Sequence, residues 1–279
     1  MKKRTIFAVL AVALAVGTVN QAPVSACYGV RAMGMGGAFI GVADDVNAVY
    51  WNPAGIAFTK ETQANIQHIT NNRELINYID IVEVTTPVKN GAIGLTYVKD
   101  RAAMNYLIQG QNYNQEWYVL SYGAKITDNL AIGTNIRQVV EKTALNGQTE
   151  SKHFTGLDAS LFYKNNKWSC GLLVQDFNRP TTLDGGYMIR NYRPGIAYRP
   201  DNKTIIAADI YDATDEIERA YCVGAEYKAS DAITLRAGCY QRNLTFGIGI
   251  KVGKDTEVNF AHLGGDLGGT NMIGAQTKF

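Results

Sequence analysis

The fold is decided by a pattern that is clearest in residues 244–252, which read Leu244-Thr-Phe-Gly-Ile-Gly-Ile-Lys-Val252. Every second side chain is large and apolar, and the side chains between them are small or polar. This period of two predicts a β-strand with one apolar face. The same alternation recurs in residues 118–126, 157–163, 221–228 and 233–240, whereas no long segment after residue 62 has helical periodicity.

Short turns separate these segments and set the number of strands. Turn-forming residues recur at 89–91, 127–129, 164–166, 200–202, 230–231 and 253–255. Each interval has room for two strands and a loop at the opposite end, which predicts about twelve strands after Gly91. Two more at 63–72 and 76–88 bring the total to about fourteen. Residues 102–115 are expected to form the longest loop.

A closed membrane barrel explains this pattern better than a soluble β-sandwich. Outer-membrane barrels have an even strand number, short turns at one end, longer loops at the other and aromatic residues near strand ends. Aromatic residues stand near predicted strand ends at Trp117, Tyr118, Tyr163, Trp168, Tyr198 and Tyr227. The chain also ends on Phe279 after an alternating segment, which resembles the C-terminal strand of assembled barrels. We therefore predict an all-β fold, a transmembrane antiparallel β-barrel of about 14 strands.

The first residues are typical of an export signal. Three basic residues at 2–4 precede an apolar run at 6–19, and small residues at 24–26 follow. Residues 1–26 are therefore predicted to be a cleaved signal peptide. Cys27 comes next, so either ordinary cleavage occurs before this residue or Cys27 is lipidated after cleavage.

The composition argues against several other classes of protein. Lys+Arg 27 against Asp+Glu 25 give a formal net charge of +2, which does not favour nucleic acid. With 3 His and 4 scattered Cys, we expect no metal site and no cofactor. The run Gly34-Met-Gly36 does not continue as a dinucleotide-binding motif, because Phe39 stands where the last glycine is required. We find no nucleophile–base motif and predict no catalytic residue and no enzyme activity.

The segment before the first predicted strand carries the most specific motif. Residues 31–45 read RAMGMGGAFIGVADD and residues 47–55 read NAVYWNPAG. Both resemble the N-terminal region of the FadL-like outer-membrane barrel superfamily, which includes long-chain fatty-acid and aromatic-hydrocarbon transporters and shorter barrels related to PorV. Residues 156–163 and 171–175 are similar to the same family.

The resemblance implies a fourteen-stranded barrel whose N-terminal segment folds into the lumen as a hatch. It divides the chain into a signal peptide at 1–26, a hatch at 27–62 and a barrel at 63–279. The residues implied to form the hatch and gate are Arg31, Gly34, Gly36, Gly37, Asp44, Asp45, Asn52 and Pro53. The chain is shorter than the fatty-acid transporters, whose initial binding site lies in longer loops, so the resemblance implies the fold and not the substrate.

Alternation along the predicted strands also places charged side chains in the lumen. These are Arg137, Asp158, Arg193, Asp209, Glu226, Arg236, Lys251 and Glu257. Charges of both signs beside a low-dielectric wall are expected to pair. We expect Arg31 and the Asp44–Asp45 pair to join this network and hold the hatch closed, with Asp44 opposite Arg236 as one pairing. The alternative is that the charges of the segment only solubilise an exposed terminus.

Two functions remain open. One is passive uptake of small hydrophobic or amphipathic molecules across the outer membrane of a diderm bacterium, with the N-terminal segment as gate. The other is a non-transporting, PorV-like barrel that acts as a scaffold or shuttle for exported proteins. The partners are thus outer-membrane lipid and either a hydrophobic ligand or an exported protein. An apolar path lined by residues such as Met33, Phe39 and Tyr50, or a kink between strands, favours transport, whereas a hatch sealed by salt bridges together with an exposed apolar rim favours a protein partner.

Overall fold

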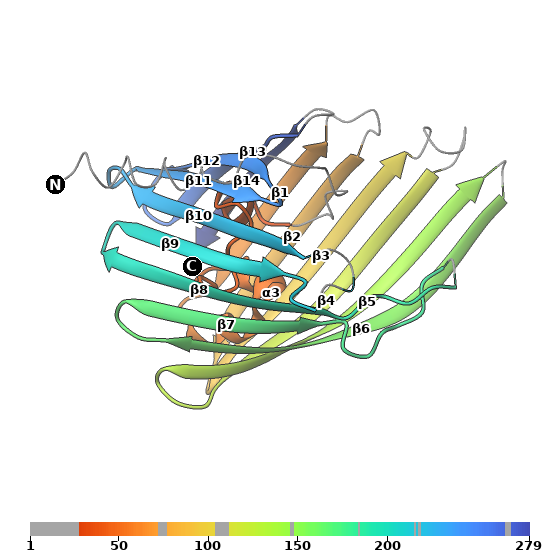
Figure 1. The fold of residues 1–279 in the computed structure, drawn as a ribbon, viewed down its shortest axis with the longest axis horizontal. Coiled ribbons are helices and arrows are strands. Elements are labelled where there is room, and N and C mark those ends of the chain that lie inside the picture. Colours follow the sequence, from red (N-terminus) through yellow and green to blue (C-terminus); the bar gives the residue numbers. More distant parts are fainter. Residues whose placement is uncertain are drawn as a thin grey trace.

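The computed structural model describes residues 28–71, 77–103, 112–145, 148–183, 185–214, 216, 219–265 and 269–279. Fourteen antiparallel strands form one closed barrel, in which strands that are neighbours in sequence pair and β1 pairs with β14 (Figure 1). The predicted all-β fold and strand number are confirmed. The predicted signal peptide and Cys27 lie outside the described residues.

The elements follow the order of the chain. The strands are β1 Gln63–Asn71, β2 Asn77–Val88, β3 Gly91–Ala103, β4 Asn112–Lys125, β5 Leu130–Leu145, β6 Gln148–Lys164, β7 Trp168–Gln175, β8 Asn191–Asp201, β9 Thr204–Tyr211, β10 Ala220–Lys228, β11 Ile233–Tyr240, β12 Asn243–Lys251, β13 Thr256–Leu263 and β14 Thr270–Lys278. Three short helices precede them: α2 Val30–Gly34, α3 Ala48–Trp51 and η1 Pro53–Phe58. Within the described ranges, no helix is long and apolar enough to cross a membrane.

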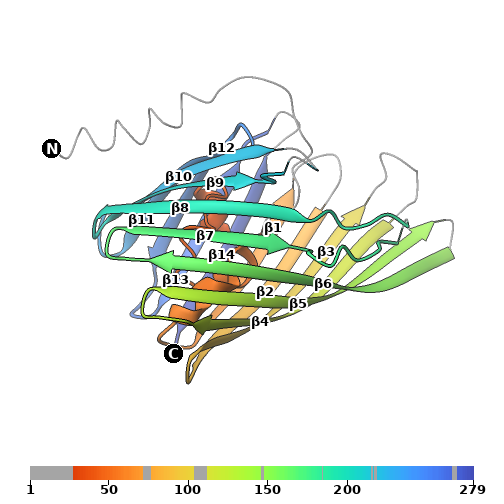
Figure 2. The ribbon, with the colours of Figure 1, turned by 60° about the horizontal axis from the view of Figure 1, so that its bottom comes forward.

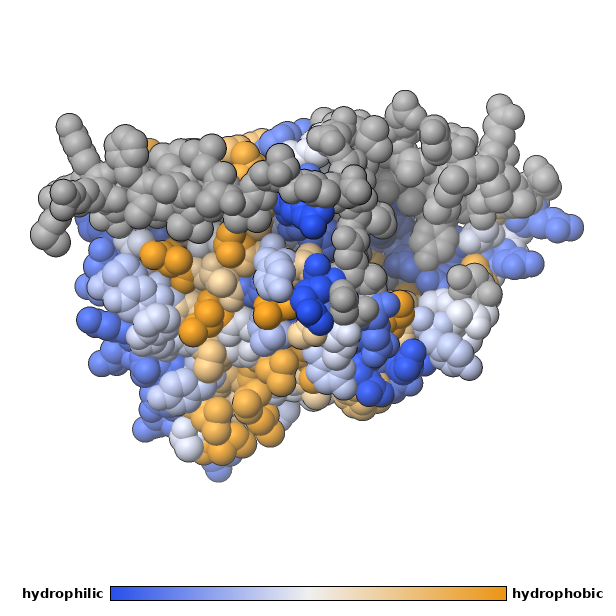
Figure 3. Space-filling model, in the orientation of Figure 1, coloured by the Kyte–Doolittle hydropathy of each residue, from blue (hydrophilic) through white to orange (hydrophobic). Residues whose placement is uncertain are grey.

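The period of two in the sequence becomes the two faces of the barrel wall. In β12, Leu244, Phe246 and Ile250 are exposed on the outside, whereas Thr245 is buried inside. The other strands repeat this arrangement, and part of the resulting apolar outer surface is orange in Figure 3. Apolar surface of this extent is unfavourable in water and favourable in the hydrocarbon of a bilayer. The outer surface is therefore the membrane-facing side of the wall.

Strands β1 and β14 close the wall. Their pairing runs from Gln63 opposite Lys278 to Asn71 opposite Thr270. The backbone N–H of Phe279 then donates to the carbonyl oxygen of Thr62 at 2.9 Å. The closed ladder leaves no sheet edge in lipid, where no water is present to bond an unpaired backbone group.

The wall is taller on one side. Strands β4, β5 and β6 have 14, 16 and 17 residues, whereas β11, β12 and β13 have 8, 9 and 8. The long strands project beyond the others at one end of the barrel, on the right of Figure 1. We call this end the loop end. The other end has short connections, such as residues 89–90 and 202–203, and we call it the short-turn end.

The prediction that residues 102–115 form the longest loop is wrong. Strand β3 runs to Ala103 and β4 begins at Asn112, so both strands continue into that segment. Asn114 and Gln115 belong to the part of β4 that projects at the loop end, and their polarity is why this segment resembled a loop in the sequence. A longer connection, residues 176–190, joins β7 to β8.

Residues 28–58 lie inside the barrel, where Figure 2 shows their short helices in orange. The helices are short because turn and cap residues interrupt them. Gly36 and Gly37 have positive φ angles of 66° and 69°, which end α2. Asn52 accepts a hydrogen bond from the N–H of Ala54 at 3.2 Å, and Pro53 starts η1, where its missing N–H is not needed.

We expect Leu120→Arg, on the outer face of β4, to destabilise the barrel by about 2–4 kcal/mol, because it places a charge near the middle of the hydrocarbon. Urea titration in bilayers, followed by tryptophan fluorescence, measures the loss. Gln138→Arg, on the same face but nearer the loop end, is the control and should lose at most about 1 kcal/mol. Equal losses would contradict this placement of the membrane.

Candidate functional site

The candidate site is the lumen, where the N-terminal segment meets inward side chains of the wall. Helix α2 packs against β11 to β14, and η1 packs against β3 to β6. The segment is therefore held on two sides of the barrel. Its contacts fall into an ion cluster at its start, hydrogen bonds at its middle and a capped turn at its end.

Arg31 is the centre of the first ion cluster. Its Nη1 lies 2.6 Å from Asp44 Oδ1 and 2.9 Å from Asp45 Oδ2. Its Nε lies 2.7 Å from Glu226 Oε2, and Arg236 Nε donates to the same oxygen at 2.6 Å. The segment and the wall are thus joined by two cations that share one carboxylate.

This cluster keeps its charge while it is largely shielded from water. Burial lowers the pKa of Arg31, but the carboxylates of Asp44, Glu226 and Asp45 outweigh burial and hold that pKa well above its ordinary value. Removing one partner of a buried ion pair costs about 3–5 kcal/mol, because the other charge stays buried and unpaired. The cluster therefore holds α2 firmly against the wall.

The expected pairing of Asp44 with Arg236 is wrong. Arg236 Nη2 lies 3.0 Å from Glu257 Oε1, and the second cation near Asp44 is Arg199, whose Nη2 lies 3.1 Å from Asp44 Oδ2. The cause is the path of the chain. Residues 35–43 lead from the neighbourhood of β11, where Gly34 lies beside Arg236, to β8, on which Arg199 stands.

A second ion cluster forms around Arg137 on β5. Arg137 Nη2 lies 3.6 Å from Asp158 Oδ1 on β6 and donates to Asp176 Oδ1 just after β7. Its guanidinium lies 4.9 Å from the centre of the Trp117 ring. Burial raises the pKa of Asp176, although Arg137 lowers it. The sequence did not indicate Asp176, because this residue lies in a turn with φ 52° and not on a strand face.

Asp209 and Arg193 contact the middle of the segment. Asp209 Oδ2 on β9 accepts hydrogen bonds from the two backbone N–H groups of residues 39–40, each at 2.7 Å. The guanidinium of Arg193 on β8 lies 4.7 Å from the ring of Trp51 and 4.9 Å from the ring of Tyr211. Both wall residues were predicted to face the lumen, and their partners could not be read from the sequence.

Asn52 and Pro53 lie at the end of the segment and are buried there. Asn52 Nδ2 donates to the carbonyl oxygen of Ile40 at 3.1 Å and to that of Leu161 on β6 at 3.2 Å. The N–H of Ala54 donates to Ser160 Oγ, also on β6, at 2.9 Å. The side chain of Asn52 thus connects residue 40 and the turn at residue 54 with β6 of the wall.

Lys251 lies apart from these clusters. It stands opposite Glu257 in the ladder of β12 and β13, but it is the last residue of β12 and is exposed. Glu257 pairs with Arg236 instead. Lys251 is therefore on the lumen side of the wall, as the alternation predicted, but it lies at the end of the strand, where its side chain is exposed to water.

Glu83 on β2 is a buried carboxyl that the sequence did not indicate. It is 2% exposed and accepts hydrogen bonds from Asn65 Nδ2 and Gln67 Nε2, both at 2.9 Å. Residues 81–84 read Ile-Val-Glu-Val, so large apolar residues stand on both faces of this strand. The alternation therefore gave no reason to assign Glu83 to the lumen.

The loop-end half of the lumen combines apolar side chains with charged ones, since the Arg137 cluster and Glu141, which is 3% exposed, also lie there. Its buried, inward apolar side chains are Ile69, Ile79, Val98, Trp117, Val139, Phe154, Tyr211, Leu263 and Met272. Tyr28 extends this surface onto the segment, since its ring centre lies 5.0 Å from that of Trp117 and 5.1 Å from that of Tyr50. The Arg31 cluster lies toward the short-turn end.

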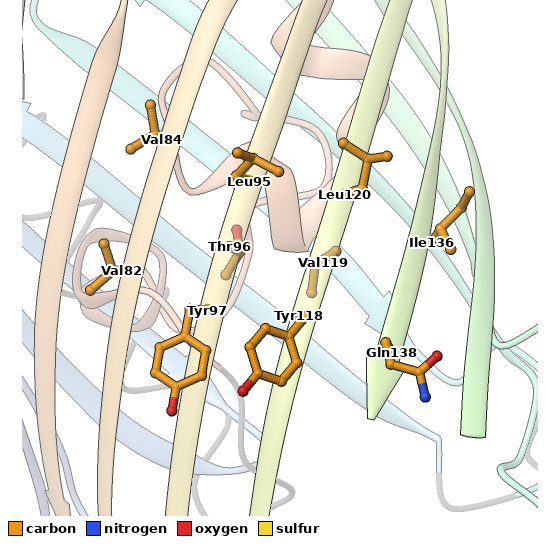
Figure 4. Close-up of a pocket in the computed structure, with 10 residues that line it drawn as sticks. All are labelled: Val82, Val84, Leu95, Thr96, Tyr97, Tyr118, Val119, Leu120, Ile136 and Gln138. Atoms are coloured by element: carbon orange, nitrogen blue, oxygen red, sulfur yellow. The ribbon is translucent and has the colours of Figure 1, made fainter. Parts of the chain in front are cut away.

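A hollow on the outside of the wall is a separate feature. It spans β2 to β5, measures about 460 Å³ and lies beside Tyr97 and Tyr118, whose ring centres are 5.2 Å apart (Figure 4). Because it opens on the membrane-facing side, lipid chains fill it in a bilayer. We therefore do not count it as part of the site.

The described residues hold no group of three or more His, Cys, Asp or Glu side chains that could bind a metal ion. Cys170 and Cys239, on β7 and β11, are free thiols. Chemically, the lumen offers paired charges, backbone hydrogen bonds and apolar surface.

Solved structures with the same architecture exist, although no family model and no curated protein matches this sequence. The toluene transporter TbuX of Ralstonia pickettii matches over 90% of this chain and 98% of its own, with a TM-score of 0.67 and 13% identity. A FadL homologue of Pseudomonas aeruginosa matches over 89% and 95%, with a TM-score of 0.61 and 11% identity. A deletion mutant of the monoaromatic hydrocarbon channel TodX matches over 90% and 99%, with a TM-score of 0.63 and 13% identity.

Fold and lumen define the class of this protein, a closed fourteen-stranded barrel occupied by its own N-terminal segment. Its fold is that of the FadL-like transporters, and the resemblance predicted from residues 31–55 is confirmed at the level of the fold. Two of these structural neighbours are a transporter and a channel, and at 11–13% identity the likeness is one of fold alone.

Gly36 supplies a test of how closely segment and wall fit. A Cβ added there would lie 2.5 Å from the backbone nitrogen of Cys239, at a φ of 66°. We expect Gly36→Ala to lower the free energy of unfolding by about 2–4 kcal/mol, from backbone strain and overpacking together. Gly253→Ala, at φ 97° with nothing within 4 Å, is the control for strain alone and should lose about 1 kcal/mol. Equal urea midpoints for the two variants would refute the close fit.

Proposed function

We propose that this chain is an outer-membrane protein that takes up small hydrophobic or amphipathic molecules passively, with residues 28–58 as the gate. The fold shared with a toluene transporter and a monoaromatic hydrocarbon channel supports a transport role. The observation that carries the proposal is the group of apolar side chains that face the lumen toward the loop end, beside the Arg137 cluster.

An apolar lining selects for hydrophobic solutes. Porin lumens are polar and filled with water, because ions and sugars must stay hydrated as they pass. Here Trp117, Phe154 and Tyr211 face the lumen beneath the loop end. A hydrophobic molecule that moves from water onto such a surface gains about 25 cal/mol for each Å² that it buries. This half of the lumen would therefore collect hydrophobic molecules from outside the cell.

The contacts of the N-terminal segment support its proposed role as a gate. Met33 and Phe39, the residues expected to line an apolar path, are 1% and 0% exposed and are packed within the core. The Arg31 cluster joins the same segment to the wall. Passage therefore needs a movement of the segment, and ions are excluded while it stays in place, because a desolvated ion in this core is costly.

The test combines two measurements. Uptake of the hydrophobic probe N-phenyl-1-naphthylamine by diderm cells that carry the chain should be faster than by cells without it. The purified chain should conduct no ions in planar bilayers. Trp117→Asp should slow probe uptake about tenfold, because a charged side chain makes the lining unfavourable for apolar molecules, and Trp117→Phe should preserve uptake.

Arg31→Met is the test of the gate within the same experiment. It leaves Asp44, Asp45 and Glu226 without their shared cation, so the segment should loosen and the variant should conduct ions. Probe uptake equal to that of cells without the chain would refute transport. Uptake without any conductance in Arg31→Met would refute the assigned role of this cluster in gating.

A second candidate function is a PorV-like barrel that scaffolds or shuttles exported proteins, and the free edge of β6 favours it. Strand β6 pairs with β7 only from Ala159 to Lys164, so residues 148–158 extend past the end of β7. The backbone of Leu157 forms hydrogen bonds with Phe177 and Asn178 across this edge. In an antiparallel strand the backbone groups of every second residue point to the same side, so those of residues 149, 151 and 153 also face this edge.

At this edge, the backbone groups of Thr149, Ser151 and His153 have no hydrogen-bond partner within the described residues. A free sheet edge in water accepts an extended segment of another protein as an added strand. The connection that could cover this edge lies across the sheet instead, where Leu183 N–H donates to Glu141 Oε2 at 2.8 Å.

Ser151→Pro tests the second candidate. It removes one N–H from the free edge, while the hydrogen bonds between β5 and β6 stay intact. If β6 binds exported proteins, their display on the cell surface, measured by surface biotinylation, should fall at least about tenfold. Ser151→Ala keeps the N–H and is the control. Unchanged display in Ser151→Pro would eliminate this candidate and leave the uptake proposal standing.

A further inference from the structure

Two hollows open at the short-turn end of the barrel, and they differ in charge. One measures about 360 Å³, and its charged residues are Lys167, Arg199, Lys203, Lys228, Asp201 and Glu226. The other measures about 260 Å³, and its charged residues are Lys251, Lys254, Lys278, Glu61, Asp255 and Glu257. The second hollow balances three lysines with three carboxylates, whereas the first has four cations and two carboxylates. We call the first one the basic hollow.

The two carboxylates of the basic hollow are bound by groups other than its cationic side chains. Glu226 Oε2 lies 2.7 Å from Arg31 Nε and 2.6 Å from Arg236 Nε. Asp201 Oδ1 accepts a hydrogen bond from the backbone N–H of Lys203 at 2.8 Å, in the turn between β8 and β9. Within the described part of the chain, neither carboxylate forms an ion pair with a cation of the hollow.

The excess positive charge lies on Lys167 and Lys203. Arg199 Nη2 lies 3.1 Å from Asp44 Oδ2, and Lys228 Nζ lies 3.5 Å from Asp231 Oδ1, so these two cations have partners outside the hollow. Among the described residues, no carboxylate forms an ion pair with Lys167 or Lys203, and both side chains are exposed. These two ammonium groups are therefore accessible to a ligand.

Backbone hydrogen bonds fix the positions of the four cations. The N–H of Arg199 donates to the carbonyl oxygen of Lys167 at 2.7 Å, and the N–H of Lys228 donates to that of Lys203 at 2.8 Å. Like charges that stand opposite each other in a sheet repel, and here the backbone keeps them side by side. An anion bound between them would remove this repulsion.

We propose that the basic hollow binds a small soluble molecule that carries two or more carboxylate or phosphate groups. A lysine binds such a group as a compact point charge, so the two unpaired lysines fit two of them. The apolar residues of the lining are Pro200 and Ile205, so a hydrophobic molecule gains little there. Outer-membrane barrels have their short turns in the periplasm, and the ligand would come from that compartment. The proposal does not depend on transport.

Calorimetric titration tests this proposal. The purified full chain, in micelles of an uncharged detergent at neutral pH and low salt, is titrated with pyrophosphate and, separately, with citrate. At least one of them should bind with a dissociation constant below about 1 mM, and acetate, with one carboxylate, should bind at least about tenfold more weakly. The tighter of the two identifies phosphate or carboxylate as the preferred group. In about 1 M salt, which screens the charges, binding should weaken at least about tenfold.

Two pairs of substitutions separate this hollow from a general effect of net charge. Lys167→Gln with Lys203→Gln should weaken binding at least about tenfold, because it removes both unpaired cations. Lys251→Gln with Lys254→Gln is the matched control, since it removes the same charge from the balanced hollow at the same end. The control should change the affinity less than about twofold. All four lysines are exposed, so neither pair disturbs the packed interior.

The unaltered chain alone can overturn the proposal. If neither pyrophosphate nor citrate binds to it at low salt, the proposal is wrong, and an acidic segment of another protein becomes the candidate partner of these lysines. Equal weakening by the two pairs of substitutions, in chains that are folded by their heat-dependent shift on a gel, would also overturn it. Either result leaves the uptake proposal intact, because that proposal is tested with a hydrophobic probe.

Discussion

The pairing of β14 with β1 is the interaction on which the rest of the structure depends. In hydrocarbon, an unpaired backbone group costs several kcal/mol, so the wall must be a closed ring of strands. Closure gives every strand an outer face that contacts lipid and an inner face that does not, which allows Arg137, Glu226 and Arg236 to occur in membrane-spanning strands. It also encloses a lumen, and the N-terminal segment supplies the side chains and backbone that occupy it.

The side chains of the lumen differ between its two halves. Toward the loop end, aromatic and aliphatic side chains around Trp117 offer apolar surface. Toward the short-turn end, Arg31 and Arg236 share Glu226 and tie the segment to the wall. The structural neighbours share this barrel fold. The proposed function rests in addition on the side chains that face the lumen of this chain.

Most of the fold could be predicted from the sequence, because strand alternation and turn residues are local signals. Alternation also identified inward residues such as Arg137, Asp209 and Arg236. Their partners could not be predicted, because pairing depends on the register between strands and on the path of the segment across the lumen. For this reason Asp44 meets Arg199 and not Arg236. Asp176 and Glu83 were missed for local reasons: one lies in a turn with positive φ, and the other stands on a strand with two apolar faces.

The close fit at Gly36 restricts how the lumen can open. Gly36 approaches the backbone of β10 and β11, Gly41 that of β8, and on the wall Gly133 approaches the backbone of Ala54. Contacts between backbones on several sides block sliding of the segment along the barrel axis as a rigid body. The proposed uptake would therefore require part of the segment to unfold locally while the wall keeps its shape. The rate of passage would then follow the kinetics of local unfolding, and it would rise with temperature far more steeply than diffusion through a permanent channel.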